Sequence, residues 1–536
     1  MADESVQRTL PEVVQAAAAA HGAHIAIQDG PVQLTYAELD QARRRAAAAY
    51  VAAGLRSGDR IAIWAPNMYQ WILAAIGAQS LGITLVPINT RWKGSEAAYA
   101  LKLSHVRALF CVGEFLGQDY PAMLAGQDLP DLQSIVLFAG AGSSPESVQL
   151  ASGSVPLQSW KQFLASGAQV TDGEVDQLAA LVTPDTVLDI GFTSGTTGAP
   201  KGVVTTHGQN IRVFETWSAT VGLRADDNYL IVNPFFHSFG YKAGWLAAII
   251  RGARILPVLS FDLDAVLAQI EADRVTMLPG APTIYQSILA HPDRSKYDLS
   301  SLRLAVTGAA PVPVELVNRM RQELQFETVV TAYGLTESCG TVTICESDDP
   351  AELISSTSGK AMDGVEVRMV DVAGNDVAPG EPGEIWVRGY NVMQGYLDNP
   401  EATAQAITAD GWLKTGDVGR MDDSGYVAIT DRIKDMFIVG GFNCYPAEIE
   451  NALCSLPGVS QAAVIGIPDE RMGEVTCAFM VLEPGVNLDA DAVIAWSREH
   501  MANYKVPRAV HIVASLPVNA SGKVLKNQLR EQVAAT

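Results

Sequence analysis

The 536-residue sequence predicts an α/β fold, with a large N-terminal domain of mostly parallel sheets and flanking helices, a β-rich subdomain and a small C-terminal α+β domain. Strand–helix–strand patterns recur between residues 60 and 138 and again after residue 225, which favours parallel sheets covered by helices. Short alternating strands separated by Asp, Gly and Pro turns occupy the stretch at 340–430. A compact mixture of helix and strand patterns then fills the C-terminal part from 435 onward.

Composition excludes several classes of function. The formal net charge is −22, which disfavours nucleic acid or an anionic membrane as partner and requires any nucleotide site to be built from a few placed cations. The six cysteines show no CxxC spacing, so neither a zinc site nor a disulfide framework is predicted. The acidic N-terminus lacks the features of a signal peptide, and no apolar run approaches the roughly 20 residues that span a bilayer. We therefore expect a reduced, cytoplasmic protein without a transmembrane segment.

The N-terminal region is patterned as helices alternating with short strands. Thr35 and Glu38 form a capping box, and the helix that it begins continues to Ala53 and is ended by Gly54. Residues 139–180 are rich in Gly, Ser and Gln and weakly patterned, so we expect an irregular surface excursion there. The sequence further predicts a helix at 69–81 and strands at 60–64, 84–87, 108–112 and 134–138.

The rest of the chain is organised around the loop at residues 192–202, Phe-Thr-Ser-Gly-Thr-Thr-Gly-Ala-Pro-Lys-Gly. A strand at 187–192 leads into it and another at 203–205 leaves it. Its glycines let the backbone approach an anion, its hydroxyl and N–H groups can donate to phosphate oxygens, and Lys201 adds a positive charge. It is not a Walker A loop, because Pro200 precedes the lysine and Gly202 follows it. We therefore predict a polyphosphate site rather than a flexible connector.

This run resembles the signature loop of the adenylate-forming superfamily, which includes acyl- and aryl-CoA synthetases, peptide-synthetase adenylation domains and luciferases. The resemblance extends over essentially the whole chain and is greatest to bacterial fatty-acyl-CoA synthetases. It implies that the loop holds ATP and that Thr193 also lies at the metal. The ATP-binding residues it implies here are Thr193, Ser194, Gly195, Thr196, Thr197, Gly198 and Lys201.

A second motif at residues 233–240 follows an apolar strand at 229–232. The resemblance implies that His237 is catalytic and lies with Phe239 and Gly240 along the route by which the carboxylate meets the α-phosphate. A core histidine satisfied by its neighbours is the alternative for a ring flanked by aromatic residues.

The same region bears on the kind of acid. Between Tyr229 and Asp262 there is no acidic residue to pair with a substrate amine, which argues for an acid without an amino group. We expect Gly240 and Gly244 to leave room for the acyl group. Lys242 either faces solvent or contacts a polar substrate tail.

Two further strand ends are implied to complete the nucleotide site. A strand at 302–307 ends in small residues on which a flat ring can lie, and one at 329–331 leads into Ala332-Tyr333-Gly334-Leu335-Thr336-Glu337. By resemblance, Tyr333 stacks on adenine, Thr336 donates to the α-phosphate and Glu337 holds Mg²⁺, which prefers carboxylate, phosphate and water oxygens. The other residues implied at the nucleotide are Gly308, Ala309, Ala310, Ala332 and Gly334, and those at the acid are Thr307, Gly334 and Cys339.

The β-rich subdomain, with strands predicted at 365–370, 383–388 and 426–430, contains Asp417. A carboxylate can accept from two ribose hydroxyls, and the resemblance gives Asp417 that role, a turn Asp being the alternative. It further implies that Arg432 contacts ribose or phosphate, that Lys434 is the hinge, and that Gly440 and Gly441 line the path of the coenzyme A arm.

The C-terminal part is predicted to form helices at 446–456 and 490–501 and strands at 459–466 and 476–482. Near its end, Lys523 lies in an exposed Ser-Gly-Lys turn. The resemblance implies that Lys523 is a catalytic and nucleotide-binding lysine on a mobile domain of residues 433–536, which rotates against an N-terminal domain of residues 1–432.

The activity implied is ATP-dependent activation of a carboxylic acid as acyl-AMP, with pyrophosphate release, followed by transfer of the acyl group to coenzyme A. A fatty or a cyclic, steroid-derived acid is expected, with ATP, Mg²⁺ and coenzyme A as co-substrates and cofactors. The alternatives are an aryl-acid CoA ligase, a stand-alone adenylation domain feeding a carrier protein, and a luciferase-type oxygenase. A regulatory protein that has lost catalysis would be expected to lack Lys523 or Glu337, and both are present. The oligomeric state is not predicted, although a homodimer is compatible with the sequence.

Overall fold

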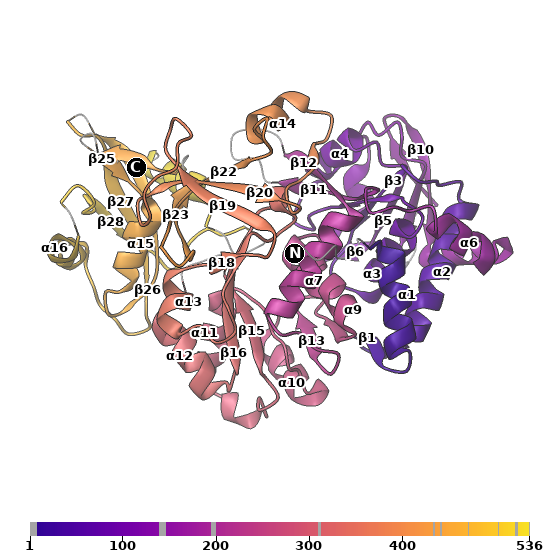
Figure 1. Ribbon diagram of the computed structural model, residues 1–536, viewed down its shortest axis with the longest axis horizontal. Coiled ribbons are helices and arrows are strands. Elements are labelled where there is room, and N and C mark those ends of the chain that lie inside the picture. Colours follow the sequence, from indigo (N-terminus) through magenta and orange to yellow (C-terminus); the bar gives the residue numbers. More distant parts are fainter. Residues whose placement is uncertain are drawn as a thin grey trace.

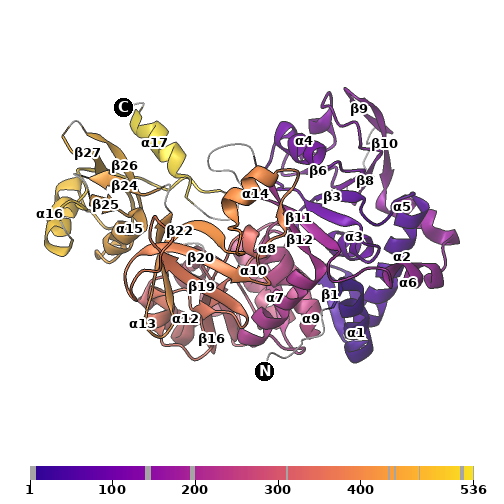
Figure 2. The same cartoon turned by 45° about the horizontal axis from the view of Figure 1, so that its top comes forward.

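The computed structural model describes residues 8–138, 146–193, 200–308, 312–432, 435–439, 442–469, 471–501, 503–519 and 524–534. The N-terminal sheets and helices form the larger part of the molecule, and the β-rich subdomain lies between them and a smaller C-terminal lobe (Figures 1 and 2). This arrangement confirms the predicted α/β class with a smaller C-terminal domain. Among the helices of these ranges, none combines the length and apolarity that a bilayer span requires.

A nine-stranded sheet carries the candidate phosphate loop. Its strand order is β21-β12-β11-β4-β3-β5-β8-β10-β9, with parallel pairing from β11 through to β10. Because parallel strands buried on both faces need continuous apolar runs, β3 and β4 have the bounds that the sequence predicts. The strands are β3 Arg60–Trp64, β4 Thr84–Pro87, β5 Ala108–Cys111, β8 Ser134–Leu137, β9 Ser147–Leu150, β10 Gly153–Ser159, β11 Val187–Thr193, β12 Lys201–Thr206 and β21 Gly395–Tyr396.

A second layer of strands supports the candidate acid and adenine sites. The strands pair in the orders β13-β14-β1-β2 and β15-β16-β17-β18, and isolated parallel bridges at Met277 connect Tyr229 of the first group to Leu304 of the second. These strands are β1 Ile25–Asp29, β2 Val32–Thr35, β13 Asn228–Ile231, β14 Arg254–Pro257, β15 Leu304–Thr307, β16 Thr328–Tyr333, β17 Thr343–Ile344 and β18 Lys360–Ala361. A separate pair is formed by β6 Glu114–Phe115 and β7 Gln118–Asp119.

Helices pack closely on these sheets. The capping box predicted at Thr35 and Glu38 is confirmed, and α2 and α3 approach so closely that a Cβ atom on Gly77 would lie 2.6 Å from that of Ala46. The N-terminal helices are α1 Leu10–His21, α2 Tyr36–Ala52, α3 Tyr69–Gln79, α4 Gly94–Leu103, α5 Trp160–Ser166, α6 Asp172–Ala179, α7 His207–Thr220, α8 Ser238–Gly240, α9 Ala247–Arg251, α10 Leu263–Asp273, α11 Pro282–Ala290, α12 Val314–Glu323 and α13 Ala351–Ser356. Short 3₁₀ turns lie at Ala122–Leu124, Gly167–Gln169, Arg294–Lys296 and Thr336–Ser338, and a π-helical segment at Tyr241–Leu246.

The expectation of an irregular excursion at 139–180 is wrong for the residues described from 146 onward. This stretch contributes β9 and β10 to the large sheet and forms the helices α5 and α6. Capping boxes begin both helices, with Ser159 paired to Gln162 and Thr171 to Glu174. These local signals define the helices even though the polar composition of the stretch suggests a loop.

The β-rich subdomain shares the hydrophobic core of the N-terminal part, and the C-terminal part has a separate core. Residues up to Ile429 pack into the core of the N-terminal part, whereas those from Phe437 onward form two clusters of their own. The predicted domain boundary between residues 432 and 433 lies in the interval between these cores and stays a prediction. The subdomain comprises β19 Val365–Val370, β20 Gly383–Gly389, β22 Leu413–Met421, β23 Val427–Arg432 and, beside them, α14 Pro400–Ala406. The C-terminal elements are β24 Phe437–Val439, β25 Phe442–Cys444, α15 Pro446–Cys454, β26 Val459–Asp469, β27 Gly473–Leu482, α16 Ala490–His500, β28 Ala509–Ile512 and α17 Lys526–Ala534.

Candidate active site

The β11–β12 hairpin presents both ends of the candidate phosphate loop at one place. Thr193, the last residue of β11, lies in register with Lys201, the first residue of β12. The side chain of Lys201 is exposed, and its ammonium stands 4.7 Å from the centre of the Tyr396 ring. The hairpin therefore places a solvent-accessible cation beside the loop. The predicted residues Ser194, Gly195, Thr196, Thr197 and Gly198 lie outside the described residues.

A tyrosine that the sequence reasoning missed connects this hairpin to Glu337. Strand β21 pairs with β12 so that Tyr396 lies opposite Val203, and the Tyr396 hydroxyl donates to Oε1 of Glu337 at 2.9 Å. Burial, reinforced by the charge of Glu337, raises the pKa of Tyr396 well above its usual range, so the hydroxyl stays protonated and acts as the donor. No periodicity or motif noted in the sequence marks Tyr396, because its role depends on a strand pairing between segments far apart in the chain.

Thr336 and Glu337 lie on the 3₁₀ turn that follows β16, close to the hairpin. A Cβ atom on Gly191 of β11 would approach the Thr336 methyl carbon to 3.0 Å, so this turn packs directly against the strand that leads into the loop. The backbone carbonyl of Glu337 accepts from the amide of Met393 at 2.9 Å, which fixes the turn on its other side. The predicted partners Thr193, Thr336 and Glu337 are therefore brought to the same region.

The residues present fit a magnesium ion that takes most of its donor atoms from phosphate groups and waters. In the part of the chain that the structure describes, no group of three or more His, Cys, Asp or Glu side chains is placed to bind a metal. Glu337 offers one hard carboxylate, and the hydrogen bond from Tyr396 to its Oε1 holds this carboxylate in one orientation. Mg²⁺ commonly takes one or two carboxylates together with phosphate oxygens and waters, which matches this donor set.

The two residues predicted to hold the nucleoside are in direct contact. The Tyr333 hydroxyl at the end of β16 donates to Oδ2 of Asp417 at 2.7 Å. Asp417 lies on β22 with only 3% of its surface exposed, and its backbone is in register with that of Arg432 on β23. Two different sheets thus hold the Tyr333 ring and the Asp417 carboxylate next to each other.

Close backbone packing shapes the turn between Tyr333 and Cys339. A Cβ atom on Gly334 would lie 2.2 Å from the carbonyl oxygen of Gly340, so only glycine fits there. Cys339 is fully buried and has a left-handed φ of 55°. Thr307 at the end of β15 is 2% exposed, and its hydroxyl has no hydrogen-bond partner among the described residues. The assignment of Gly334, Cys339 and Thr307 to the acid site stays a prediction.

Gly308 and Ala332 lie at adjacent strand ends. Thr307 of β15 is in register with Thr331 of β16, and a Cβ atom on Gly308 would lie 3.7 Å from the carbonyl oxygen of Ala332. The small residues therefore leave the predicted adenine surface open at this edge. Ala309 and Ala310, which were predicted to extend it, lie outside the described residues.

His237 lies at the start of the short helix α8. Its Nδ1 accepts from the amide of Phe239 at 3.2 Å, which is a cap on the helix and fixes the ring orientation. The His237 side chain is exposed, and the partial desolvation caused by the protein atoms on its inner side lowers the pKa of His237. A neutral ring near neutral pH follows, able to line a path for an anion without being charged.

Gly240 does not leave room for an acyl group in the way that the sequence suggested. A Cβ atom there would lie 2.3 Å from the carbonyl oxygens of both Asn233 and Pro234. The absent side chain is thus required by close backbone packing, which folds α8 back onto the end of β13. Phe239 beside it is half-buried against the main core.

Lys242 does not face solvent. Its side chain is 4% exposed, and its ammonium lies 3.1 Å from Oδ1 of Asp189 and 3.2 Å from the Thr205 hydroxyl. Asp189 and Thr205 are opposite each other on β11 and β12. Sequence reasoning overlooked Asp189, although a lone carboxylate inside the apolar strand Val187–Thr193 is a signal of a buried partner.

Several predicted residues cannot be placed. Lys523, the hinge residue Lys434 and the glycines Gly440 and Gly441 lie outside the described residues. For Arg432, the structure describes the backbone in β23 and not the side chain. Their predicted roles stay predictions.

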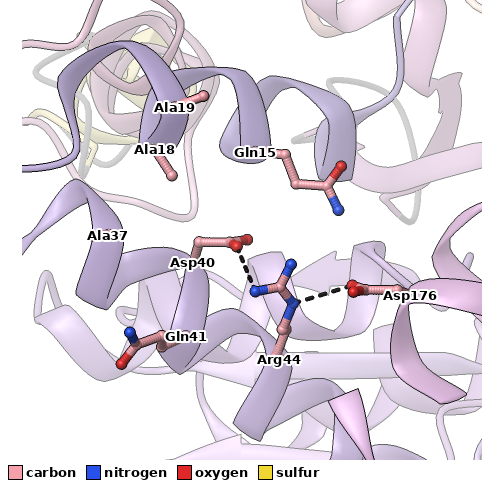
Figure 3. Close-up of a pocket in the computed structure, with 8 residues that line it drawn as sticks. All are labelled: Gln15, Ala18, Ala19, Ala37, Asp40, Gln41, Arg44 and Asp176. Atoms are coloured by element: carbon pink, nitrogen blue, oxygen red, sulfur yellow. Dashed lines mark hydrogen bonds and ion pairs between the residues drawn. The ribbon is translucent and has the colours of Figure 1, made fainter. Parts of the chain in front are cut away.

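A surface depression of about 700 Å³ lies elsewhere, between α1, α2 and α6 (Figure 3). Its charged centre is Arg44, which pairs with Asp40 at 3.0 Å and with Asp176 at 3.1 Å. Since the guanidinium is balanced by two carboxylates, it offers no free charge for an anion. None of the predicted site residues lines this depression, whose walls are formed by Gln15, Ala18, Ala19, Ala37, Asp40, Gln41, Arg44 and Asp176.

The chain is similar to known enzymes along nearly its whole length. Residues 14–397 match the AMP-binding enzyme family, and residues 448–523 match the AMP-binding enzyme C-terminal domain. A protein of Rhodococcus jostii (strain RHA1) named 3-[(3aS,4S,7aS)-7a-methyl-1,5-dioxo-octahydro-1H-inden-4-yl]propanoyl:CoA ligase is 50% identical over 98% of each chain. A Mycobacterium tuberculosis protein of the same name is 47% identical over 98% of this chain and 99% of the relative. The crystal structure of the anthranilate CoA ligase AuaEII in complex with anthranoyl-AMP is similar with a TM-score of 0.83, at 25% identity over 99% of both chains.

Proposed function

The chain belongs to the AMP-binding enzyme family and is an ATP-dependent acid:CoA ligase, and from this premise we propose that its acid is a propanoate attached to an oxidised bicyclic ring. The observation that carries the proposal is the identity of 50% and 47%, along nearly the entire chain, to two ligases named for such a dioxo-octahydroindenyl propanoate. The absence of an acidic residue between Tyr229 and Asp262 supports an acid without an amino group.

In the proposed first step, a carboxylate oxygen of the acid attacks the α-phosphorus of ATP, and pyrophosphate leaves. Two negatively charged groups must approach each other, so the protein lowers the barrier by holding them and by donating to the charge that develops. Lys201 and the N–H groups of its hairpin would hold the phosphates, and Thr336 would donate to the α-phosphate. Mg²⁺ on Glu337 would supply positive charge to the phosphate oxygens.

In the proposed second step, the sulfur of coenzyme A gives up its proton to solvent and attacks the acyl carbonyl carbon, and AMP leaves as the C–O bond to the adenylate breaks. We assign the first step to Lys523, which would bridge the carboxylate and the α-phosphate. Rotation of residues 433–536 about Lys434 would remove this lysine and bring Gly440 and Gly441 to the coenzyme. Since ATP and coenzyme A are cytoplasmic metabolites, a cytoplasmic location is part of the proposal.

The proposal is tested with purified protein, ATP, Mg²⁺ and a panel of acids, with and without coenzyme A. The panel contains the dioxo-octahydroindenyl propanoate, octanoate, cinnamate and an α-amino acid. Pyrophosphate release and the mass of the thioester are measured for each.

We expect a thioester from the bicyclic acid with kcat/KM at least about tenfold above that of the other acids, a difference of roughly 1.4 kcal/mol in transition-state binding. A preference for cinnamate would assign the protein to aryl acids instead. Pyrophosphate release that does not depend on coenzyme A and yields no thioester would favour a carrier protein as the acceptor.

A further inference from the structure

We propose that Lys242 is a specificity-determining residue whose buried ammonium donates a hydrogen bond to a ring carbonyl of the bound acid. The inference rests on the proposed function and refines it, because it names the group on this protein that would recognise the oxidised ring. It concerns a residue for which solvent exposure is the usual expectation and which is here 4% exposed.

The ammonium of Lys242 has more hydrogen-bond donors than acceptors around it. An ammonium carries three donors. Among the described residues, Lys242 has two hydrogen-bond acceptors, Oδ1 of Asp189 and the hydroxyl of Thr205. A buried ammonium with an unused donor is costly to maintain unless a ligand or water completes it.

The position of Lys242 fits a contact with the acid. It lies on the π-helical segment Tyr241–Leu246, which follows His237 and Phe239 directly and is kinked at Gly244 (ψ −107°). π-Helical turns within helices are frequently found at functional sites. The segment thus connects the predicted catalytic histidine to the buried ammonium within a few residues.

A second wall of the predicted acid site packs against the residues that lead into this segment. A Cβ atom on Gly340 would lie 3.1 Å from the Cβ of Ser238. Lys242 therefore follows, by four residues, the point at which the chain after His237 meets the Gly334–Gly340 turn. These are the two parts predicted to enclose the acid.

The competing role for Lys242 is purely structural. Asp189 and Thr205 join β11 to β12 below the phosphate loop, and Asn210 of α7 donates to Thr205 at 2.9 Å. In that role, Lys242 would fix the helix to the hairpin and would affect all acids alike. A group that contacts the ring carbonyl would instead separate oxidised from unoxidised acids.

The experiment compares two acids that differ only in ring oxygens, the 1,5-dioxo-octahydroindenyl propanoate and the corresponding hydrocarbon acid, 3-(7a-methyl-octahydro-1H-inden-4-yl)propanoate. The kcat/KM of each is measured for the wild type, Lys242→Met and the double variant Lys242→Met/Asp189→Asn, which leaves no unpaired charge. Lys296→Met, at a side chain that is 68% exposed, is the matched control. The KM for ATP reports on the hairpin.

We expect the wild type to prefer the dioxo acid and both Lys242 variants to lose this preference by about 10- to 100-fold, the range of a hydrogen bond to a charged group. The control and the KM for ATP should stay unchanged. Equal losses of kcat/KM on both acids in the Lys242 variants would overturn the inference. A wild type without preference for the dioxo acid would also overturn it, and this second result does not depend on whether a variant folds. If the wild type forms no thioester from either bicyclic acid, the proposed function itself has failed.

Discussion

The hydroxyl of Tyr396 lies 2.9 Å from Oε1 of Glu337, and the same ring lies 4.7 Å below the ammonium of Lys201. One aromatic side chain thus contacts a proposed phosphate-binding cation on one side and a proposed magnesium ligand on the other. The relationship predicts that Tyr396 orientates Glu337 without itself touching the reacting atoms.

Tyr396→Phe keeps the ring beside Lys201 and removes only the hydrogen bond to Glu337. We expect kcat for pyrophosphate release to fall about tenfold, as for the loss of one hydrogen bond to a charged group. The Mg²⁺ concentration for half-maximal rate should rise, because the carboxylate is no longer held in one orientation. Titration of the initial rate with Mg²⁺ measures both, with Tyr297→Phe as the control at a surface tyrosine. A lower rate with an unchanged Mg²⁺ dependence would contradict the orientating role.

Gly240→Ala tests whether this glycine serves packing or substrate space. Because the added Cβ would lie 2.3 Å from two carbonyl oxygens, we expect a loss of about 1 to 3 kcal/mol in the free energy of unfolding without any ligand. Gly173→Ala is the matched control, since the nearest atom to its Cβ would lie 4.0 Å away. Thermal unfolding of the free protein decides between the two roles. An unchanged melting temperature with a shifted preference among acids would restore the original interpretation.

His207 should make stability depend on pH. Burial at the start of α7 lowers the pKa of His207 to about 3, while the ring accepts from the amide of Leu10 at 3.1 Å. Below about pH 6.5 the imidazole binds a proton in the unfolded chain but not in the folded chain. The contribution of His207 to the free energy of unfolding is therefore largest above this pH, and it decreases by up to about 1.4 kcal/mol per pH unit as the pH drops toward 3.

Asn in place of His207 can keep an acceptor for the Leu10 amide and removes the titrating group. Chemical unfolding of His207→Asn above and below about pH 6.5 should therefore show a shallower pH dependence than the wild type. His24→Asn, at an exposed ring, should leave the wild-type slope intact. Parallel slopes for wild type and His207→Asn would show that other groups govern the acid sensitivity.

Lys523→Ala should separate the two half-reactions. Loss of one preorganised donor costs about 3 kcal/mol, so acyl-AMP formation should slow by some hundredfold. The conversion of supplied acyl-AMP and coenzyme A to thioester should persist, because the lysine is proposed to have left the site by then. Quenched-flow measurement of each half-reaction provides the test. An equal loss in both would contradict a scheme with two conformations.

The sequence predicted the regular elements well where apolar strands and helix caps are local signals. Strands at 60–64, 84–87 and 365–370 have the observed bounds, and Glu38 caps its helix as expected. Helices α5 and α6 were missed although their capping boxes were legible, because the polar composition around them was given more weight.

The site was harder to predict in full, because its contacts depend on tertiary pairing. Tyr333 and Asp417 were both named, but their hydrogen bond across 84 positions of sequence could not be derived from either segment alone. Lys242 was noticed without its partner, since the approach of Asp189 depends on how the π-helical segment lies on β11. Tyr396 was missed because only the pairing of β21 with β12 brings it to Glu337.

Strand β21 is two residues long and forms the outer edge of the nine-stranded sheet, next to the six residues of β12. It occupies backbone groups of β12 that would otherwise be open to pairing with a strand of another molecule. Changes that detach residues 395–396 should therefore promote self-association of the chain as well as disturb Glu337, and precipitation on storage would be an early sign of such damage.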